Sequence, residues 1–531
     1  MDRISRRQVV RGAAATAAAM TLGAPSVHAQ QGRQTLRFVA QADLKILDPV
    51  WTTAYITRNH GYLVYDTLFG TDENYQIKPQ MVDRTIVSPD GMKYTFTLRD
   101  GLQWHDGQPV LSEDCVESLK RWGKKDRFGQ LLMAHTAKIA PVDKKTFTLE
   151  LAEHFSPVLD ALGKPSSNVP FMMPARIAST SPEEQFKEIV GSGPFKFARD
   201  EWQPGEQVAY VRNPDYVPRN EAPSGSTGGK IAYLDKVIWR YIPEPWDAAE
   251  SLAAGEVDWW EEPPLDFIPK IEQNPDLQTF LIDPLGTQGW LRPNWLHPPF
   301  NNKKARQALL HMMDQVTYLH WAFGQSLYYR ACYSVFACGG PNATMIDVQP
   351  MMEHDLAKAR QLVKESGYDG QQIVVLQITD RPFLSAAAIV TRQRLESIGF
   401  NVLLKATDWS TNLIVRARKD PPDKGGWNLL HTFWQAADVA NPAVHFGVSG
   451  AGPRAWFGWP DVPLLEKLVT DWVRATDQAK RKQLADEVQK VALSEVTYVP
   501  WGEWFQPTAF RKNVQGVLRF GAPIFWNVRV A

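Results

Sequence analysis

Cysteine is scarce in this chain, and its scarcity narrows the possible chemistry. Only three cysteines occur among 531 residues, and no cysteine or histidine spacing matches a zinc site. Cys332 and Cys338 are close enough in sequence to close a small loop in an oxidising compartment, whereas Cys115 stands alone. We therefore predict a disulfide between Cys332 and Cys338, a buried free thiol at Cys115, no metal and no cofactor.

An excess of charge of either sign is also lacking. Lysine plus arginine total 58, and aspartate plus glutamate total 58. A chain this close to neutral lacks the basic surface that DNA or RNA requires, so the sequence argues against a nucleic-acid partner. No G-x-S-x-G motif and no glycine-rich phosphate loop in a suitable context occurs, and the sequence does not predict an enzyme.

No apolar run is long enough to span a membrane. The mildly apolar residues 13–22 follow the twin-arginine pattern SRRQVVR, and a small-x-small cleavage site, VHA, ends at residue 29. This order is typical of a removable signal peptide, and no cysteine at the cleavage point signals a lipid anchor. We predict a twin-arginine signal peptide over residues 1–29 and a soluble periplasmic protein that is exported already folded. The alternative is a disordered basic tail.

Tryptophan, in contrast, is abundant, with 20 residues. These side chains either fill a large core or line a groove in which flat or amphipathic ligands stack. The length of the chain favours two or more lobes.

Two regions differ in their pattern. Residues 35–289 mix short alternating strands with turn clusters, and residues 222–230, APSGSTGGK, are typical of a flexible surface loop. From about residue 302 onward, helices and strands alternate, which predicts a parallel sheet. The predicted elements are helices over residues 355–368 and 384–398 and strands over residues 372–379, 401–407 and 427–434.

Three of these predicted strands end at charged side chains. The first ends at Arg381, the second at Asp408 and Trp409, and the third leads to Asp438. If the strands are parallel, these groups share the edge of the sheet where ligands of open α/β sheets bind. An arginine can bind a carboxylate and an aspartate can accept an ammonium, so the pair suits a zwitterion. The alternatives are a helix cap at Asp438 and a surface salt bridge at Arg381.

Several stretches, in order, resemble one family. YTFTLRDGLQWHDGQPVLSEDCVESLKR, GSGPFKF, QPGEQVAYVRNPDYV, AAESLAAGEVDWW, PPFNNKKARQAL and DLAKARQLVKESGY resemble motifs of bacterial family 5 extracellular solute-binding proteins. The resemblance covers almost the whole chain after residue 29. The chain departs from the family pattern at Trp104, Cys115 and Val217, which lie away from the three strand ends.

This resemblance implies the receptor component of an ABC importer, without catalytic residues, that serves a membrane permease and ATPase. It implies an α/β, two-lobed periplasmic binding protein of type II topology, with an extra subdomain in the first lobe. The corresponding boundaries are residues 30–290 for lobe I with its subdomain, 291–498 for lobe II and 499–531 for the return to lobe I. We expect a monomer.

The resemblance also suggests the ligand. Dipeptide-binding members of the family place an arginine of an RPY-like turn on the peptide carboxylate and an aspartate of a W-x-x-D-x-x-x-P stretch on the α-amino group. Arg381 in DRPF and Asp438 in DVANP match these two positions, although Trp434 lies four residues before Asp438 instead of three. The further candidate ligand contacts are Asp408, Trp409, Phe433 and Trp434 beside the strand ends, and Trp290 and Asn294 near the crossing between the lobes.

Two other functions stay open at this point. A protein of the same fold can carry an oligosaccharide, a nickel chelate, haem, an opine or an aromatic acid. An exported redox enzyme is the other alternative, because twin-arginine substrates often bear cofactors.

Overall fold

The structure is a computed structural model, and it describes residues 34–324 and 327–531. The predicted signal peptide, residues 1–29, lies outside the described residues. Within the described ranges, no helix has the length and apolar character needed to cross a bilayer.

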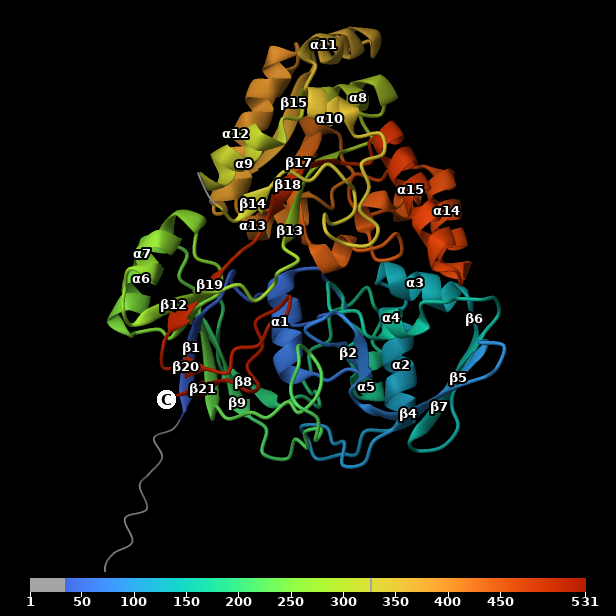
Figure 1. Ribbon diagram of the computed structural model, residues 1–531, viewed down its shortest axis with the longest axis vertical. Helices are drawn as coiled ribbons and strands as arrows, with labels where there is room; N and C mark the ends of the chain where they lie inside the picture. Colours follow the sequence, from blue (N-terminus) through green and yellow to red (C-terminus); the bar gives the residue numbers. More distant parts are fainter. Residues whose placement is uncertain (1–33, 325–326) are drawn as a thin grey trace, which may run out of the picture. The chain divides into compact units, whose positions relative to one another are not determined.

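A seven-stranded sheet joins the beginning and the end of the described chain (Figure 1). Its spatial order is β12 (Leu277–Phe280), β19 (Thr508–Arg511), β11 (Trp259–Trp260), β1 (Thr35–Val39), β10 (Lys236–Arg240), β9 (Gln207–Arg212) and β8 (Phe195–Gln203). β1 pairs in parallel with β10 and β11, and the remaining pairs are antiparallel. The helix α1 (Tyr55–Val64) packs against β8, and a core of aromatic side chains fills the space beside the sheet.

A six-stranded sheet contains the strands predicted from the alternating pattern. Its order is β14 (Tyr329–Arg330), β18 (Val499–Trp504), β13 (Thr287–Pro293), β17 (Leu429–Gln435), β15 (Gln372–Ile378) and β16 (Asn401–Thr407). β15 pairs in parallel with both β16 and β17, which confirms the predicted parallel arrangement. β13 pairs antiparallel with β17 on one side and with β18 on the other. The predicted lobe boundaries fall inside β13 and just before β18, and they remain predictions.

Helices cover this second sheet because their apolar faces match its buried strands. α12 (Pro382–Ser397) packs on β15, β16 and β17, and α9 (Gln315–Phe323) packs on β18. α11 (Leu356–Glu365) is capped by the Asp355 side chain and packs on α8 (Lys303–Met312). The other helices of this region are α10 (Gln349–Glu353), α13 (Trp409–Val415), α14 (Pro463–Arg474) and α15 (Gln478–Glu495).

A four-stranded antiparallel sheet forms a third element group. Its order is β4 (Val82–Val87), β5 (Lys93–Leu98), β7 (Thr146–Leu151) and β6 (Thr136–Pro141). β5 alternates buried and less buried residues, so one face of the sheet packs inward, and α2 (Ser112–Trp122) lies against β6 and β7. Its neighbours include α3 (Arg127–Ala134), α4 (Val158–Leu162) and α5 (Ala175–Ala178).

Smaller elements complete the described fold. They are β2 (Phe69–Thr71), β3 (Ile77–Pro79), β20 (Val514–Gln515), β21 (Arg529–Val530), α6 (Pro245–Ala254), α7 (Ile268–Glu272) and the 3-10 helices η1 (Leu265–Phe267), η2 (Pro422–Lys424), η3 (Ala436–Val439), η4 (Phe446–Val448) and η5 (Gly452–Arg454).

Residues 222–230 differ from the prediction of a surface loop. Residues 225–230 are buried, and the Lys230 ammonium donates to a buried Asp66 oxygen at 2.7 Å. Gly225 and Gly228 have positive φ, which lets the backbone turn inward without a steric penalty. The buried ion pair therefore explains how a segment rich in glycine and serine becomes part of the interior.

The cysteines are arranged as follows. Cys332 and Cys338 form a disulfide, with 5.9 Å between their Cα atoms, and Cys115 is a buried free thiol. Burial raises the pKa of the Cys115 thiol above its ordinary value.

Candidate functional site

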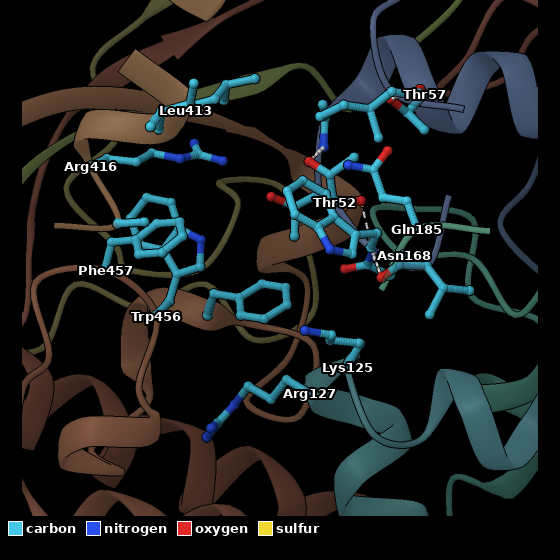
Figure 2. A pocket seen from close by; sticks show the side chains of 18 of the residues that line it. Thr52, Thr57, Lys125, Arg127, Asn168, Gln185, Leu413, Arg416, Trp456 and Phe457 are labelled. Carbon is cyan, nitrogen blue, oxygen red and sulfur yellow. Dashed lines mark hydrogen bonds between the residues drawn. The ribbon is translucent and has the colours of Figure 1, made fainter. Parts of the chain in front are cut away.

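A large cavity among the described residues has a volume of about 1370 Å³. Figure 2 shows side chains from two facing walls of this cavity. One wall carries Leu413, Arg416, Trp456 and Phe457, from α13 and the segment after η5, and the other carries Thr52, Asn168 and Gln185. A space of this size, with aromatic and polar groups in its walls, accommodates a small organic solute.

A second cavity of about 370 Å³ adjoins the first. Its lining includes Arg381, Glu262 and Phe383. The two cavities share four lining residues, which are Ala42, Asp43, Trp409 and Ser410. The indole of Trp409 therefore belongs to the walls of both spaces. We call the two spaces the large and the small cavity.

The carboxyl ends of β15, β16 and β17 place the three predicted charged groups at one edge of the sheet. Arg381 is the residue before α12, Asp408 is the residue before α13, and Asp438 lies within η3. Because β15 is parallel to both neighbours, the shared edge expected from the sequence follows from the strand directions.

Arg381 lines the small cavity, largely buried. Its Nη1 lies 3.4 Å from a carboxylate oxygen of Glu262, and its guanidinium carbon lies 5.8 Å from the centre of the Trp409 ring. Glu262 follows Glu261, and burial followed by mutual repulsion raises the pKa of Glu261 to about 7. Burial also raises the pKa of Glu262, against the effect of Arg381. The small cavity is therefore lined by one cation, Arg381, and by four acidic residues, which are Asp43, Glu262, Asp266 and Asp380.

Asp438 is buried, with 1 % of its surface exposed, and it lines neither cavity. One carboxylate oxygen accepts hydrogen bonds from the Tyr55 hydroxyl at 2.8 Å and the Ser166 hydroxyl at 2.9 Å. The other oxygen is buried and has no partner among the described residues. Burial raises the pKa of Asp438, and the positive charge of Lys164 opposes that rise. Asp438 thus keeps one oxygen available to a donor.

Asp408 and the aromatic residues near the strand ends differ in whether they line a cavity or pack in the core. Asp408 caps α13 by accepting from the Thr411 backbone N–H at 2.9 Å, and the hydrogen bond from the Thr411 hydroxyl lowers its pKa. Phe433 stacks on Trp409, the residue that lines both cavities, with 5.6 Å between the ring centres. Trp434 is nearly buried and packs against Trp290, so it forms core and not the wall of either cavity.

Trp290 and Asn294 are placed differently from the prediction of ligand contacts. Trp290 has no exposed surface, because it is stacked on Tyr498 with 4.2 Å between ring centres. Asn294 is also fully buried, and its side chain donates to the Trp427 carbonyl at 2.9 Å. Both side chains hold the six-stranded sheet and its neighbours together, and neither lines a cavity.

Sequence reasoning missed three of the cations that line the large cavity, Lys125, Arg127 and Arg416. They lie at the beginning of α3 and the end of α13, where no strand end or family motif directs attention to them. Sequence reasoning also missed Trp456, because nothing in the sequence distinguishes this tryptophan, one of 20, as a residue that lines a cavity.

One cluster of side chains among the described residues brings possible metal-ligand atoms together. It consists of Cys332, Cys338 and Glu503. The two sulfurs are bonded to each other, so they offer no thiolate to an ion.

Comparison with known proteins gives a consistent result. Residues 76–449 match the family described as "Bacterial extracellular solute-binding proteins, family 5 Middle". A probable peptide ABC transporter periplasmic-binding protein of Sinorhizobium fredii is 38 % identical over 537 residues, covering 99 % of this chain and 100 % of that protein. The glutathione-binding protein of Salmonella paratyphi A is 25 % identical, covering 88 % and 89 %.

Solved structures agree on the fold. A periplasmic binding protein of A. tumefaciens in complex with agropinic acid has a TM-score of 0.80 at 22 % identity, covering 94 % of this chain and 99 % of that one. A Helicobacter pylori periplasmic binding protein in complex with the peptide STSA has a TM-score of 0.79 at 23 % identity, covering 94 % and 98 %. These likenesses confirm the predicted α/β fold of a type II periplasmic binding protein.

Proposed function

Because this chain belongs to the bacterial extracellular solute-binding proteins of family 5, we propose that it captures a short peptide, a dipeptide or an oligopeptide, for an ABC importer. The bound peptide is delivered to a permease and ATPase complex at the inner membrane. The name of the Sinorhizobium fredii relative, a probable peptide ABC transporter periplasmic-binding protein, supports this cargo. The protein acts as a monomer in the periplasm after a twin-arginine signal peptide has been removed.

One observation carries the peptide assignment. The parallel strands β15 and β17 lead to a cation, Arg381, and to a buried carboxylate, Asp438, whose second oxygen lacks a partner among the described residues. Opposite charges at one sheet edge match the two ends of a zwitterionic peptide.

The binding step follows from these contacts. The peptide carboxylate replaces Glu262 at Arg381, and the ammonium approaches the unpartnered oxygen of Asp438. Approach to Asp438 requires Tyr55 and Ser166, which come from the first third of the chain, to move with respect to η3. Closure of two lobes around the peptide then removes water and strengthens both contacts.

Isothermal titration with short alanine peptides tests the assignment. Asp438→Asn and Arg381→Met should each weaken binding roughly a hundredfold or more, because losing one partner of a buried charged pair costs about 3–5 kcal/mol. Asp423→Asn and Arg392→Met remove exposed charges from η2 and α12, and they serve as matched controls that keep wild-type affinity. Unchanged binding in both site variants would overturn the peptide assignment.

A non-peptide solute is the second candidate, and one observation favours it. The large cavity, at about 1370 Å³, is lined by neither Arg381 nor Asp438, so most of the available space lies away from the proposed peptide ends. The same titration with cellobiose and with a nickel–histidine complex separates the candidates. Tight binding of either probe, with no peptide bound, would replace the peptide by that class of cargo.

A further inference from the structure

The large cavity contains a cation of unusual surroundings, Arg416. This residue ends α13, and only 6 % of its surface is exposed. Its guanidinium carbon lies 5.4 Å from the centre of the Trp456 ring and 5.0 Å from the centre of the Phe457 ring. Figure 2 shows the side chain extending from its wall toward the centre of the cavity.

No side chain or carbonyl group in the described parts of the chain neutralises Arg416. Its side chain makes no hydrogen bond and no ion pair there, and its Nε is buried without a partner. Burial lowers the pKa of the guanidinium, because the charged form loses its hydration. One turn earlier, the buried Asn412 amide also lacks partners for both its nitrogen and its oxygen. Buried polar groups are normally paired, so Arg416, which lines the cavity, is placed to receive a polar group from outside the chain, whereas Asn412 does not line it.

Three of the four other cations in the described lining have partners. Lys45 lies 3.8 Å from Asp43, Lys125 lies 2.8 Å from Glu183, and Arg127 lies 3.3 Å from Glu466. The remaining acidic lining residue, Asp408, caps α13, and Arg454 is exposed. Arg416 is therefore the single buried cation of the described lining that lacks a counter-charge, and the cavity has a place for one negative group.

We propose that Arg416 binds a carboxylate that the solute carries in addition to its two peptide ends, so that the preferred peptide has an acidic side chain. A planar guanidinium pairs with a carboxylate through two parallel hydrogen bonds, and flanking aromatic rings keep the site dry. This inference rests on the proposed function, because it assigns the peptide's own carboxylate to Arg381 in the small cavity.

A paired peptide set tests the inference across several ligand lengths. The probes are alanine peptides of two to five residues that contain one glutamate, each matched by a peptide with glutamine at the same position. Native mass spectrometry of the protein with the equimolar mixture identifies the bound pair, and titration then gives both Kd values. Wild-type protein should bind the glutamate peptide roughly 10–100-fold more tightly than its glutamine partner.

Arg416→Gln should bind the glutamate and the glutamine peptide with equal affinity, and a circular dichroism spectrum that matches the wild type should show that the variant is folded. Arg416→Lys should keep part of the preference, and Arg418→Gln, at an exposed position that lines neither cavity, should keep all of it. Equal binding of both peptides by the wild type, or a preference that survives in Arg416→Gln, would overturn the inference and leave peptide capture standing. Failure of every peptide to bind would remove the proposed function, and this inference with it.

Discussion

At the scale of single residues, the proposed binding of a peptide carboxylate at Arg381 would put that carboxylate in competition with Glu262. The two side chains are 3.4 Å apart, and neither is fully buried. Glu262→Gln keeps the shape of the side chain but removes its charge. We expect this variant to bind alanine peptides up to roughly fivefold more tightly, because an incompletely buried ion pair is worth up to about 1 kcal/mol. Titration against wild type measures the change, and weaker binding would contradict a competing role for Glu262.

The same substitution should change the pH dependence of stability. Glu261 has a pKa of about 7 in the fold, above its ordinary value, so the folded state holds this proton more tightly than the unfolded chain does. The resulting stabilisation is fully present below pH 4.5, falls as the pH rises, and is lost above about pH 7. Removing the like charge of Glu262 should lower the pKa of Glu261 and reduce the fall in Tm between about pH 5 and pH 8. Glu256→Gln, at an exposed position, is the control and should leave that fall unchanged.

Residue roles were predictable from the sequence only where a strand end or a motif marked them. Arg381 stood out through the strand before it and the DRPF turn after it, and its place in a cavity wall agrees with that reasoning. Arg416 lies in VRARKD, an ordinary basic stretch at a helix end. Its isolation comes from Trp456 and Phe457, which are 40 residues or more away, and no local pattern reports such packing.

At the scale of elements, the disulfide between Cys332 and Cys338 closes a short loop and should stabilise the fold locally. Glu503 of β18 accepts a hydrogen bond from the Cys338 backbone N–H at 2.7 Å and so joins this loop to the sheet. Replacing both cysteines with serine should lower the free energy of unfolding by about 2 kcal/mol, the loop-closure value for so short a loop. Urea unfolding measures this loss. Peptide affinity should not change, since the loop lines neither cavity.

A reductant supplies the control for the disulfide experiment. Dithiothreitol should lower the stability of the wild type to that of the double-serine variant and should leave the variant unaffected. A reductant effect of equal size in both proteins would place the sensitivity elsewhere than in this bond.

Elements were predictable where sequence periodicity and burial coincide. The residues of β15 and β16 match the predicted strands almost residue for residue, because an apolar run between polar turns describes a buried strand. For residues 222–230, the prediction of a surface loop was wrong, because much of the segment is buried. Its small polar residues suggest solvent, and only the distant Asp66 explains why Lys230 is buried.

At the scale of the whole molecule, the seven-stranded sheet connects the two ends of the described chain. β19, near the carboxyl end, pairs with β11, and β11 pairs with β1 at the beginning. Such a sheet is completed only after residue 511 has been synthesised. The twin-arginine pattern predicts a route that exports proteins already folded, which would require this sheet to form before export.

Replacing Arg6 and Arg7 with lysine tests that route. We expect the paired substitution to leave the full-length chain in the cytoplasm with its signal peptide uncleaved, because the route depends on the arginine pair. Cell fractionation and the mass of the accumulated chain provide the measurement. Lys120→Arg and Lys124→Arg together, far from the signal peptide, should leave export normal, and unimpaired export of the double-lysine variant would exclude the twin-arginine route.

The fold as a whole was accessible from the sequence because ordered family motifs span almost the entire chain. The size and position of the cavities were not, since they depend on where segments from the two sheets meet. Seven tryptophans, for example, are among the largest fully buried side chains, whereas Trp409 and Trp456 line a cavity. The sequence around a tryptophan does not indicate whether its side chain is buried in the core or lines a cavity.

The shared indole of Trp409 has a consequence for the size of the cargo. A guest that occupies only one of the two cavities contacts Trp409 from that side and leaves the other cavity filled with water. A guest that bound both Arg381 and Arg416, as we propose, would have to extend from one cavity into the other past Trp409, so such a site would favour molecules long enough to enter both.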